Sequence, residues 1–171
     1  MTRGLASLCL AVGVLLALPA ADALACANEQ AHPGAVSTRA YARAVRCLVN
    51  EQRAAAGLRA LHADRRLARA ARQFSGAMVR EGFFDHVSPE GATLVERARA
   101  AGYPGGTLGE TLGWGAGALA TPRAIVDGWM ASPPHHAIVL GAVFRRIGIG
   151  VATGSPAGAP AAATVTADFG G

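Results

Sequence analysis

The residues best suited to chemistry in this sequence are His86, Glu110 and His135. Imidazole and carboxylate groups can bind a borderline divalent metal such as Zn²⁺, and each can also act as a general acid or base. Their separations of 24 and 25 residues fit no local metal-binding motif, so only the fold can bring the three together. Taken alone, each has an ordinary interpretation as a histidine hydrogen-bonded in a turn or a solvated glutamate.

Each of the three lies beside a structural marker. His86 lies in the segment 83–91, Phe-Phe-Asp-His-Val-Ser-Pro-Glu-Gly, where an aromatic helix exit runs into a turn. Glu110 lies in a glycine-rich strand candidate, and His135, followed by His136, comes after a Ser-Pro helix-start signal. If the three groups converge, the Glu110 carboxylate should favour the charged form of both imidazoles and raise their pKa above about 6.5.

Three other motifs are discarded. Asp-Phe-Gly at 168–170 has the spelling of a kinase metal motif, but the chain contains no lysine. The glycines at 113–115 suggest a dinucleotide loop, but no βαβ unit surrounds them. No Gly-x-Ser-x-Gly motif occurs, so serine hydrolase chemistry has no visible nucleophile.

Capping residues and apolar periodicity predict helices mainly in the first half of the chain. The expected helical segments run through 41–52 with a stop at Gly57, between Asp64 and Gly82, over 94–101 after a Thr-x-x-Glu capping box, from Pro122 through Trp129, and briefly from Pro133 onward. Strands are expected at 108–114, 144–152 and 163–169, with a Gly- and Pro-rich hairpin loop at 154–160. This order predicts an α+β domain with an antiparallel sheet covered by helices.

Composition excludes several classes of protein. With 51% hydrophobic and 16% charged residues among 171, the chain is neither disordered nor a coiled coil. The net charge of +5 comes from arginines alone and does not by itself imply nucleic acid. Arginines recur in two stripes, interpreted as solvated faces, with contact to an anionic envelope polymer as the alternative. These stripes are 39, 43, 46, 53 and 65, 66, 69, 72.

The N-terminus predicts export. Arg3, an apolar run over 5–18 and Ala-Leu-Ala at 23–25 are typical of a signal peptide over residues 1–25, and nothing later resembles a transmembrane span. Cleavage would leave Cys26 and Cys47, which should pair in an oxidising compartment and stabilise the fold by roughly 3 kcal/mol. A reactive thiol or metal ligand is the alternative for the cysteines, and a lipid anchor at Cys26 is the alternative to full secretion.

The ordered motifs resemble a bacterial CAP (SCP-like) domain, of the superfamily of cysteine-rich secretory proteins, antigen five and pathogenesis-related proteins. The resemblance rests on Cys-Leu-Val-Asn-Glu-Gln-Arg at 47–53, Phe-x-His-x-Ser-Pro-x-Gly at 84–91, Gly-Glu at 109–110, Trp-x-x-Ser-Pro-x-His at 129–135 and Ile-Gly-Ile-Gly at 147–150. It implies an α-β-α sandwich with a central antiparallel sheet, and a domain over 43–171 preceded by a disulfide-tied segment over 26–42. It also places Phe74, Met78, Trp129 and Ile149 in the core.

The resemblance also implies a cleft with a His/Glu tetrad that holds a divalent metal in some members. His86, Glu110 and His135 match three of its positions, the fourth falls on Ser132, and His136 is an alternative ligand. Thr111 stands where the family usually has Asn. The expected function is a secreted, monomeric binding or interaction module, extracellular or periplasmic, for an unknown extracellular ligand or envelope component. The alternatives are a metal-assisted hydrolase with Glu110 as base, and lipid or sterol binding.

Overall fold

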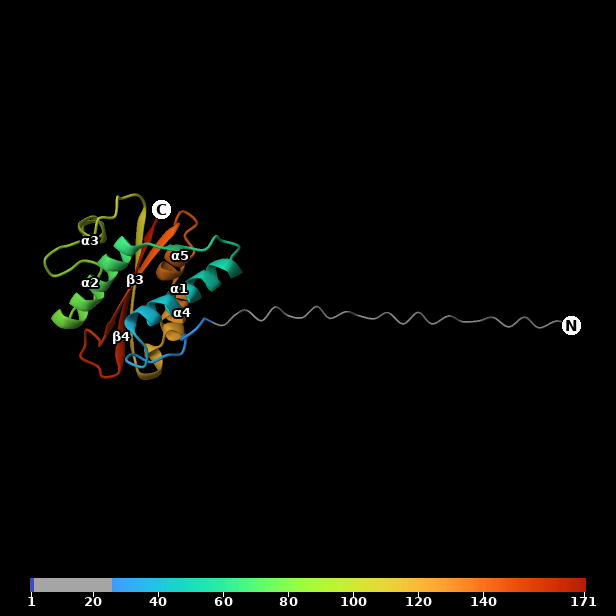
Figure 1. Cartoon of the computed structure of the whole chain (residues 1–171), viewed down its shortest axis with the longest axis horizontal. Helices are drawn as coiled ribbons and strands as arrows, with labels where there is room; N and C mark the ends of the chain where they lie inside the picture. Colours follow the sequence, from blue (N-terminus) through green and yellow to red (C-terminus); the bar gives the residue numbers. More distant parts are fainter. Residues whose placement is uncertain (2–25) are drawn as a thin grey trace.

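The computed structural model describes Met1 and residues 26–171, so the predicted signal peptide lies almost wholly outside the described residues. Five α-helices, a short 3₁₀ helix and four strands make up the domain (Figure 1). The elements are α1 (Thr38–Ala55), β1 (His62–Ala63), α2 (Arg65–Glu81), α3 (Leu94–Ala100), β2 (Leu108–Ala116), η1 (Gly117–Ala120), α4 (Pro122–Ala131), α5 (Pro133–Val139), β3 (Arg146–Thr153) and β4 (Ala162–Gly170).

The helices begin and end where local signals place them. Asp64 caps α2 by accepting hydrogen bonds from the backbone N–H groups of Arg66 and Leu67, and Gly82 ends α2 in the left-handed conformation. Thr93 and Glu96 form a reciprocal capping box at the start of α3. Thr121 caps α4, whose first residue is a proline.

The strands form one sheet in the order β1-β3-β4-β2. The three long strands pair antiparallel, as predicted, whereas the two-residue β1 was not predicted and pairs parallel to the start of β3. The sheet is therefore mixed, and the α+β prediction is confirmed. Beyond its pairing with β1, β3 forms an edge of the sheet along most of its length.

Helices cover both faces of the sheet (Figure 1). Helices α1, α4 and α5 pack on one face, against alternate residues of β3 and β4, in the main hydrophobic core. Helices α2 and α3 cover the other face, where Phe74 and Met78 pack against Leu112 of β2. All four residues expected in the core are buried: Phe74, Met78, Trp129 and Ile149.

Two features fasten the packing. The predicted disulfide between Cys26 and Cys47 is present and ties the start of the described chain to α1. On the α2 face, β3 carries Gly148 and Gly150, and a Cβ on Gly150 would lie 2.1 Å from the backbone carbonyl carbon of Ala71. Helix α2 therefore rests directly on the backbone of β3. None of the helices in the described part of the chain is long and apolar enough to span a bilayer.

Candidate functional site

Glu110 is the centre of a polar cluster on the α2 face of the sheet. It lies in β2, and its side chain is only 3% exposed. One carboxylate oxygen, Oε1, lies 2.7 Å from Nδ1 of His86, and the other, Oε2, accepts a hydrogen bond of 2.5 Å from Nη2 of Arg97. Because a buried carboxyl group needs partners to offset its lost hydration, these two contacts explain how Glu110 is tolerated in a buried position on this face of the sheet.

Arg97 holds the loop that carries His86. It projects from the last turn of α3, and its Nη1 donates to the backbone carbonyl oxygens of His86 (2.9 Å) and Ala92 (2.8 Å). Its guanidinium carbon lies 3.4 Å from the centroid of the Phe74 ring, in a cation–π arrangement. One side chain therefore connects α3, the His86 loop, the core beneath α2 and the Glu110 carboxylate. Sequence reasoning assigned Arg97 no role, because nothing local marks it as more than a helix-surface arginine.

His86 presents its imidazole to solvent while one ring nitrogen is engaged. Its side chain is 55% exposed, and the loop between α2 and α3, residues 82–93, contains no helix or strand. The hydrogen bond to Glu110 raises the pKa of His86 above its usual value of about 6.5, against the opposing effect of partial burial. The predicted pairing of His86 with Glu110 is thus seen in the structure, with the expected direction of the shift.

Asp168 is a second buried carboxyl that sequence reasoning missed. It lies in β4 directly opposite Glu110 in the strand register, and it is completely buried. Neither of its carboxyl oxygens has a hydrogen-bond partner among the described residues. Burial and the neighbouring Glu110 carboxylate raise the pKa of Asp168 well above its usual value, which favours the neutral form of the acid. The cluster thus contains one carboxyl group held by two polar partners and a second without a hydrogen-bond partner among the described residues.

His135 lies in α5 and is half-buried. Burial lowers its pKa, and the positive charge of His86 lowers it further. The expectation that both imidazoles would have raised pKa values is therefore wrong for His135. It is desolvated, and among the described residues it makes no hydrogen bond to Glu110 that could favour its charged form. The neighbouring His136 is exposed.

Comparison with known proteins assigns the chain that carries this site to a family. The sequence profile described as "Cysteine-rich secretory protein family" (CAP) matches residues 47–169. The chain belongs to this family. The Uncharacterized protein YkwD of Bacillus subtilis (strain 168) is 35% identical to this CAP protein over 114 residues, which are 67% of this chain and 43% of that protein. The chain therefore spans less than half the length of this curated relative.

Solved structures share the fold of this CAP domain. An outer surface protein from Borrelia burgdorferi has a TM-score of 0.68 at 18% identity, covering 79% of this chain and 95% of that one. An extracellular protein containing an SCP domain from Bacillus anthracis str. Ames has a TM-score of 0.64 at 23% identity, covering 78% of this chain and 43% of that one. At these identities the likeness establishes the fold alone.

The predicted metal site depends on how closely the possible ligand atoms of this CAP domain lie to one another. Among residues 26–171, the three donors found within 4.8 Å of one another belong to Cys26, Cys47 and Glu51. The two sulfurs there are bonded to each other and supply no thiolate ligands. The set His86, Glu110 and His135 does not reach that mutual spacing, and both oxygens of Glu110 are already engaged. As they lie, these residues do not bring three donor atoms together as a three-ligand metal site requires.

Proposed function

We propose that this CAP domain is an extracellular binding module that uses the charged imidazole of His86 to recognise an anionic glycan-type ligand. The observation that carries the proposal is the engagement of Glu110 on both sides, by His86 Nδ1 at 2.7 Å and by Arg97 Nη2 at 2.5 Å. A carboxylate held in this way orients the imidazole and raises its pKa, which favours the charged form. The same engagement disfavours Glu110 as a general base, which needs a free oxygen within reach of a water or substrate proton.

The surroundings of His86 suit ligand binding. Phe84 and Val87, in the same loop as His86, are exposed large apolar side chains. Aromatic rings next to a charged group are typical of recognition sites, because the ring supplies contact area and the charge supplies orientation. Sugar rings bearing carboxylates offer a complementary surface to this combination.

The proposal can be tested with soluble peptidoglycan fragments, which carry both sugar rings and carboxylates. In wild-type protein, NMR signals of the His86 ring should shift as fragments are added at a pH of about 7. Glu110→Gln should weaken binding there, because it removes the hydrogen bond that raises the pKa of His86. Binding should recover at a pH of about 5.5, where the imidazole is charged without help. The matched control is Glu90→Gln, an exposed acid in the same loop.

Two outcomes would contradict the proposal. If the His86 signals do not respond to the fragments, the site does not bind them. If wild-type protein cleaves the fragments and Glu110→Gln does not, the hydrolase interpretation replaces the binding one. Titration with Zn²⁺ in the same spectra tests the metal prediction, since coordination requires neutral imidazole and should weaken as the pH falls below about 6.

Secretion is part of the same proposal. The support is the disulfide between Cys26 and Cys47, which belongs to an oxidising compartment, and the extracellular or outer-surface description of the structural neighbours. The predicted cleavage before Cys26 is tested by the intact mass of the exported protein. A mass retaining residues 1–25 would contradict cleavage, and a diacylglycerol adduct on Cys26 would establish a lipid anchor instead.

A further inference from the structure

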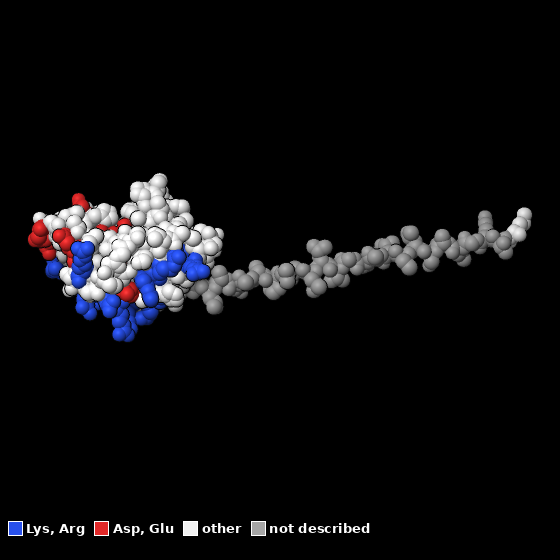
Figure 2. Space-filling view, turned by 90° about the horizontal axis from the view of Figure 1, so that it is seen from above, with Lys and Arg blue, Asp and Glu red and all other residues white. Residues whose placement is uncertain are grey.

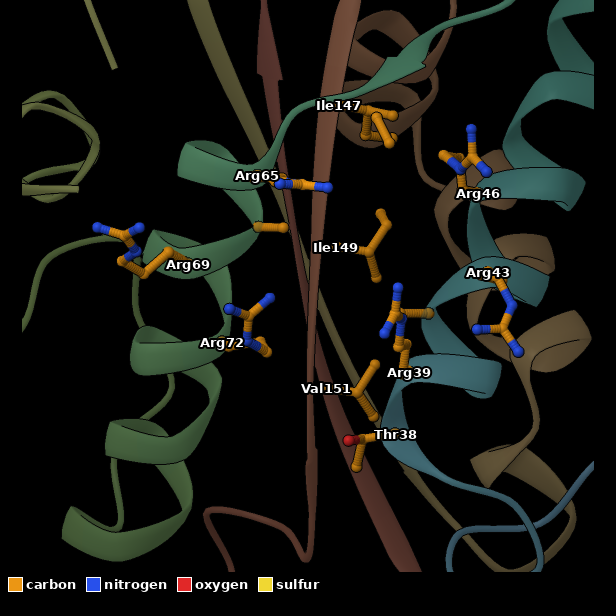
Figure 3. A pocket seen from close by; sticks show the side chains of 13 residues that line it. Thr38, Arg39, Arg43, Arg46, Arg65, Arg69, Arg72, Ile147, Ile149 and Val151 are labelled. Atoms are coloured by element: carbon orange, nitrogen blue, oxygen red, sulfur yellow. The ribbon is translucent and has the colours of Figure 1, made fainter. Parts of the chain in front are cut away.

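A groove lined by six arginines lies between α1 and α2, away from the His86 site (Figure 3). Its volume is about 620 Å³, within the range of about 300–1,000 Å³ typical of ligand sites. Ile147, Ile149 and Val151 of β3 form an apolar floor. The arginines are Arg39, Arg43 and Arg46 on α1, and Arg65, Arg69 and Arg72 on α2.

The two walls of the groove carry the same residue pattern. Residues 39–46 and 65–72 both read Arg-x-x-Ala-Arg-x-x-Arg, and in each wall all four named positions line the groove. Because residues at i, i+4 and i+7 share one face of a helix, each wall presents a ladder of three guanidinium groups. The alanines, Ala42 and Ala68, leave space between the arginines above the floor.

The charge of the groove is not compensated. No aspartate or glutamate lines it, and within residues 26–171 none of the six arginines forms an ion pair. In Figure 2 most of the visible arginines lie along the lower edge of the globular part, whereas most of the visible acids lie at its left end. Six cations facing one another raise a positive potential that an anionic partner would relieve.

The groove also contains a strand edge that is unpaired among the described residues beyond Ile147. Parallel pairing with β1 involves only Arg146 and Ile147 of β3, with the N–H of Asp64 donating to the carbonyl oxygen of Ile147. Bonding alternates along a strand, so the next residues whose backbone groups point to this edge are Ile149 and Val151. Among the described residues, no strand pairs with β3 on this side beyond Ile147.

We propose that this groove binds an extended acidic peptide, which adds as a strand to the free edge of β3. Backbone hydrogen bonds to Ile149 and Val151 would hold the peptide, in the β-addition mode of recognition. Its side chains would point alternately toward the α1 and α2 walls, where carboxylates meet the arginine ladders. An apolar floor suits a peptide backbone with apolar residues better than a bare phosphate chain, which has no apolar surface to bury.

The experiment measures fluorescence anisotropy of a labelled peptide of about eight residues, a usual strand length, made of glutamates with valine at the third and sixth positions. It should bind wild-type protein and weaken as salt is added. The double variant Arg43→Glu, Arg69→Glu should bind about tenfold more weakly or worse, since each reversal replaces an attraction by a repulsion. The matched control, Arg59→Glu with Arg99→Glu, makes the same charge change at exposed arginines outside the groove and should bind within about twofold of wild type.

Two N-methylated versions of the peptide separate strand addition from plain charge attraction. One version is methylated at the odd-numbered amides and the other at the even-numbered amides. Because the amides of a strand point alternately to its two edges, only one of the two versions loses the N–H groups that would donate to β3. One version should lose binding, while the other keeps it. Equal binding by both versions overturns the proposal, as does equally tight binding of inorganic polyphosphate that is sensitive to the same arginines. Failure of the acidic peptide to bind also overturns it, and assigns the arginines to guarding the edge against aggregation.

Discussion

Replacing Gly150 by alanine tests the close contact between α2 and β3. A Cβ at this position would lie 2.1 Å from the carbonyl carbon of Ala71, 2.2 Å from its oxygen and 2.3 Å from the backbone nitrogen of Arg72. Ordinary contacts of a Cβ begin at 3.4 Å, so the helix must retreat by about 1.3 Å, since backbone atoms cannot turn aside as a side chain can.

The cost of that retreat follows from what α2 buries. Gaps of 0.5–1 Å forfeit about a quarter to a half of the dispersion energy of each contact, and Phe74 and Met78 of α2 are buried against the sheet. The hydroxyl of Ser75 in α2 also donates a hydrogen bond of 2.8 Å to Oγ1 of Thr166 in β4. Overpacking usually costs about 1–3 kcal/mol. We expect Gly150→Ala to lower the free energy of unfolding by about 3 kcal/mol or more.

The matched control is Gly128→Ala in α4. Gly128 is exposed, and a Cβ there would meet no atom within 4 Å. Alanine favours a helix over glycine by roughly 0.5–1 kcal/mol, so the same chemical change should stabilise the protein. Both values come from urea unfolding of the oxidised protein, followed by circular dichroism. A loss below about 1 kcal/mol for Gly150→Ala would refute the claim that α2 rests on the β3 backbone.

Three further predictions concern the core and the polar cluster. Phe74→Ala should cost about 3–5 kcal/mol in urea unfolding, whereas Phe84→Ala, at an exposed ring, should change stability by about 0.5 kcal/mol at most. Glu110→Gln should lower the NMR-measured pKa of His86, so the stability that this pair contributes below about pH 6.5, and that is lost as the pH rises through the raised pKa, should disappear. Asp168→Asn should make the protein more stable than wild type at pH 7, because the folded state keeps a proton that the unfolded chain releases above a pKa of about 3.9. In wild type the free energy of unfolding should therefore fall by up to about 1.4 kcal/mol per pH unit as the pH rises toward the raised pKa of Asp168. If Asp168→Asn shows the same dependence of the free energy of unfolding on pH as wild type, Asp168 is ionised in the folded protein.

Local signals were sufficient for most of the secondary structure. The caps at Asp64, Thr93 and Thr121 depend on side-chain hydrogen bonds within three residues, so the sequence alone locates these helix starts. Strand β1 was missed because two residues carry no alternation pattern. Its existence depends on the parallel pairing with Arg146 and Ile147, more than 80 residues away in the chain.

The polar cluster was predictable only in part, for the same reason. The family resemblance brought His86 and Glu110 together correctly. Asp168 was set aside with a discarded motif, because its burial opposite Glu110 follows from strand register, which a single sequence does not specify. The lowered pKa of His135 likewise depends on its burial and on the nearby charge of His86, neither of which a single sequence specifies.

The central position of β4 also bears on when the chain can fold. In the order β1-β3-β4-β2, the strands β2 and β3 contact the sheet through β4, whose nine residues are all buried. No hairpin formed earlier in translation can stand in for it, so the three long strands are joined only once β4 has been synthesised. Until then α2 can pack on β3, and α1 on β3, α4 and α5, but the contacts of α2 with β4 are missing. Because β2 and β3 meet only through β4, the pairing that joins the three long strands is the last one that the described chain can make.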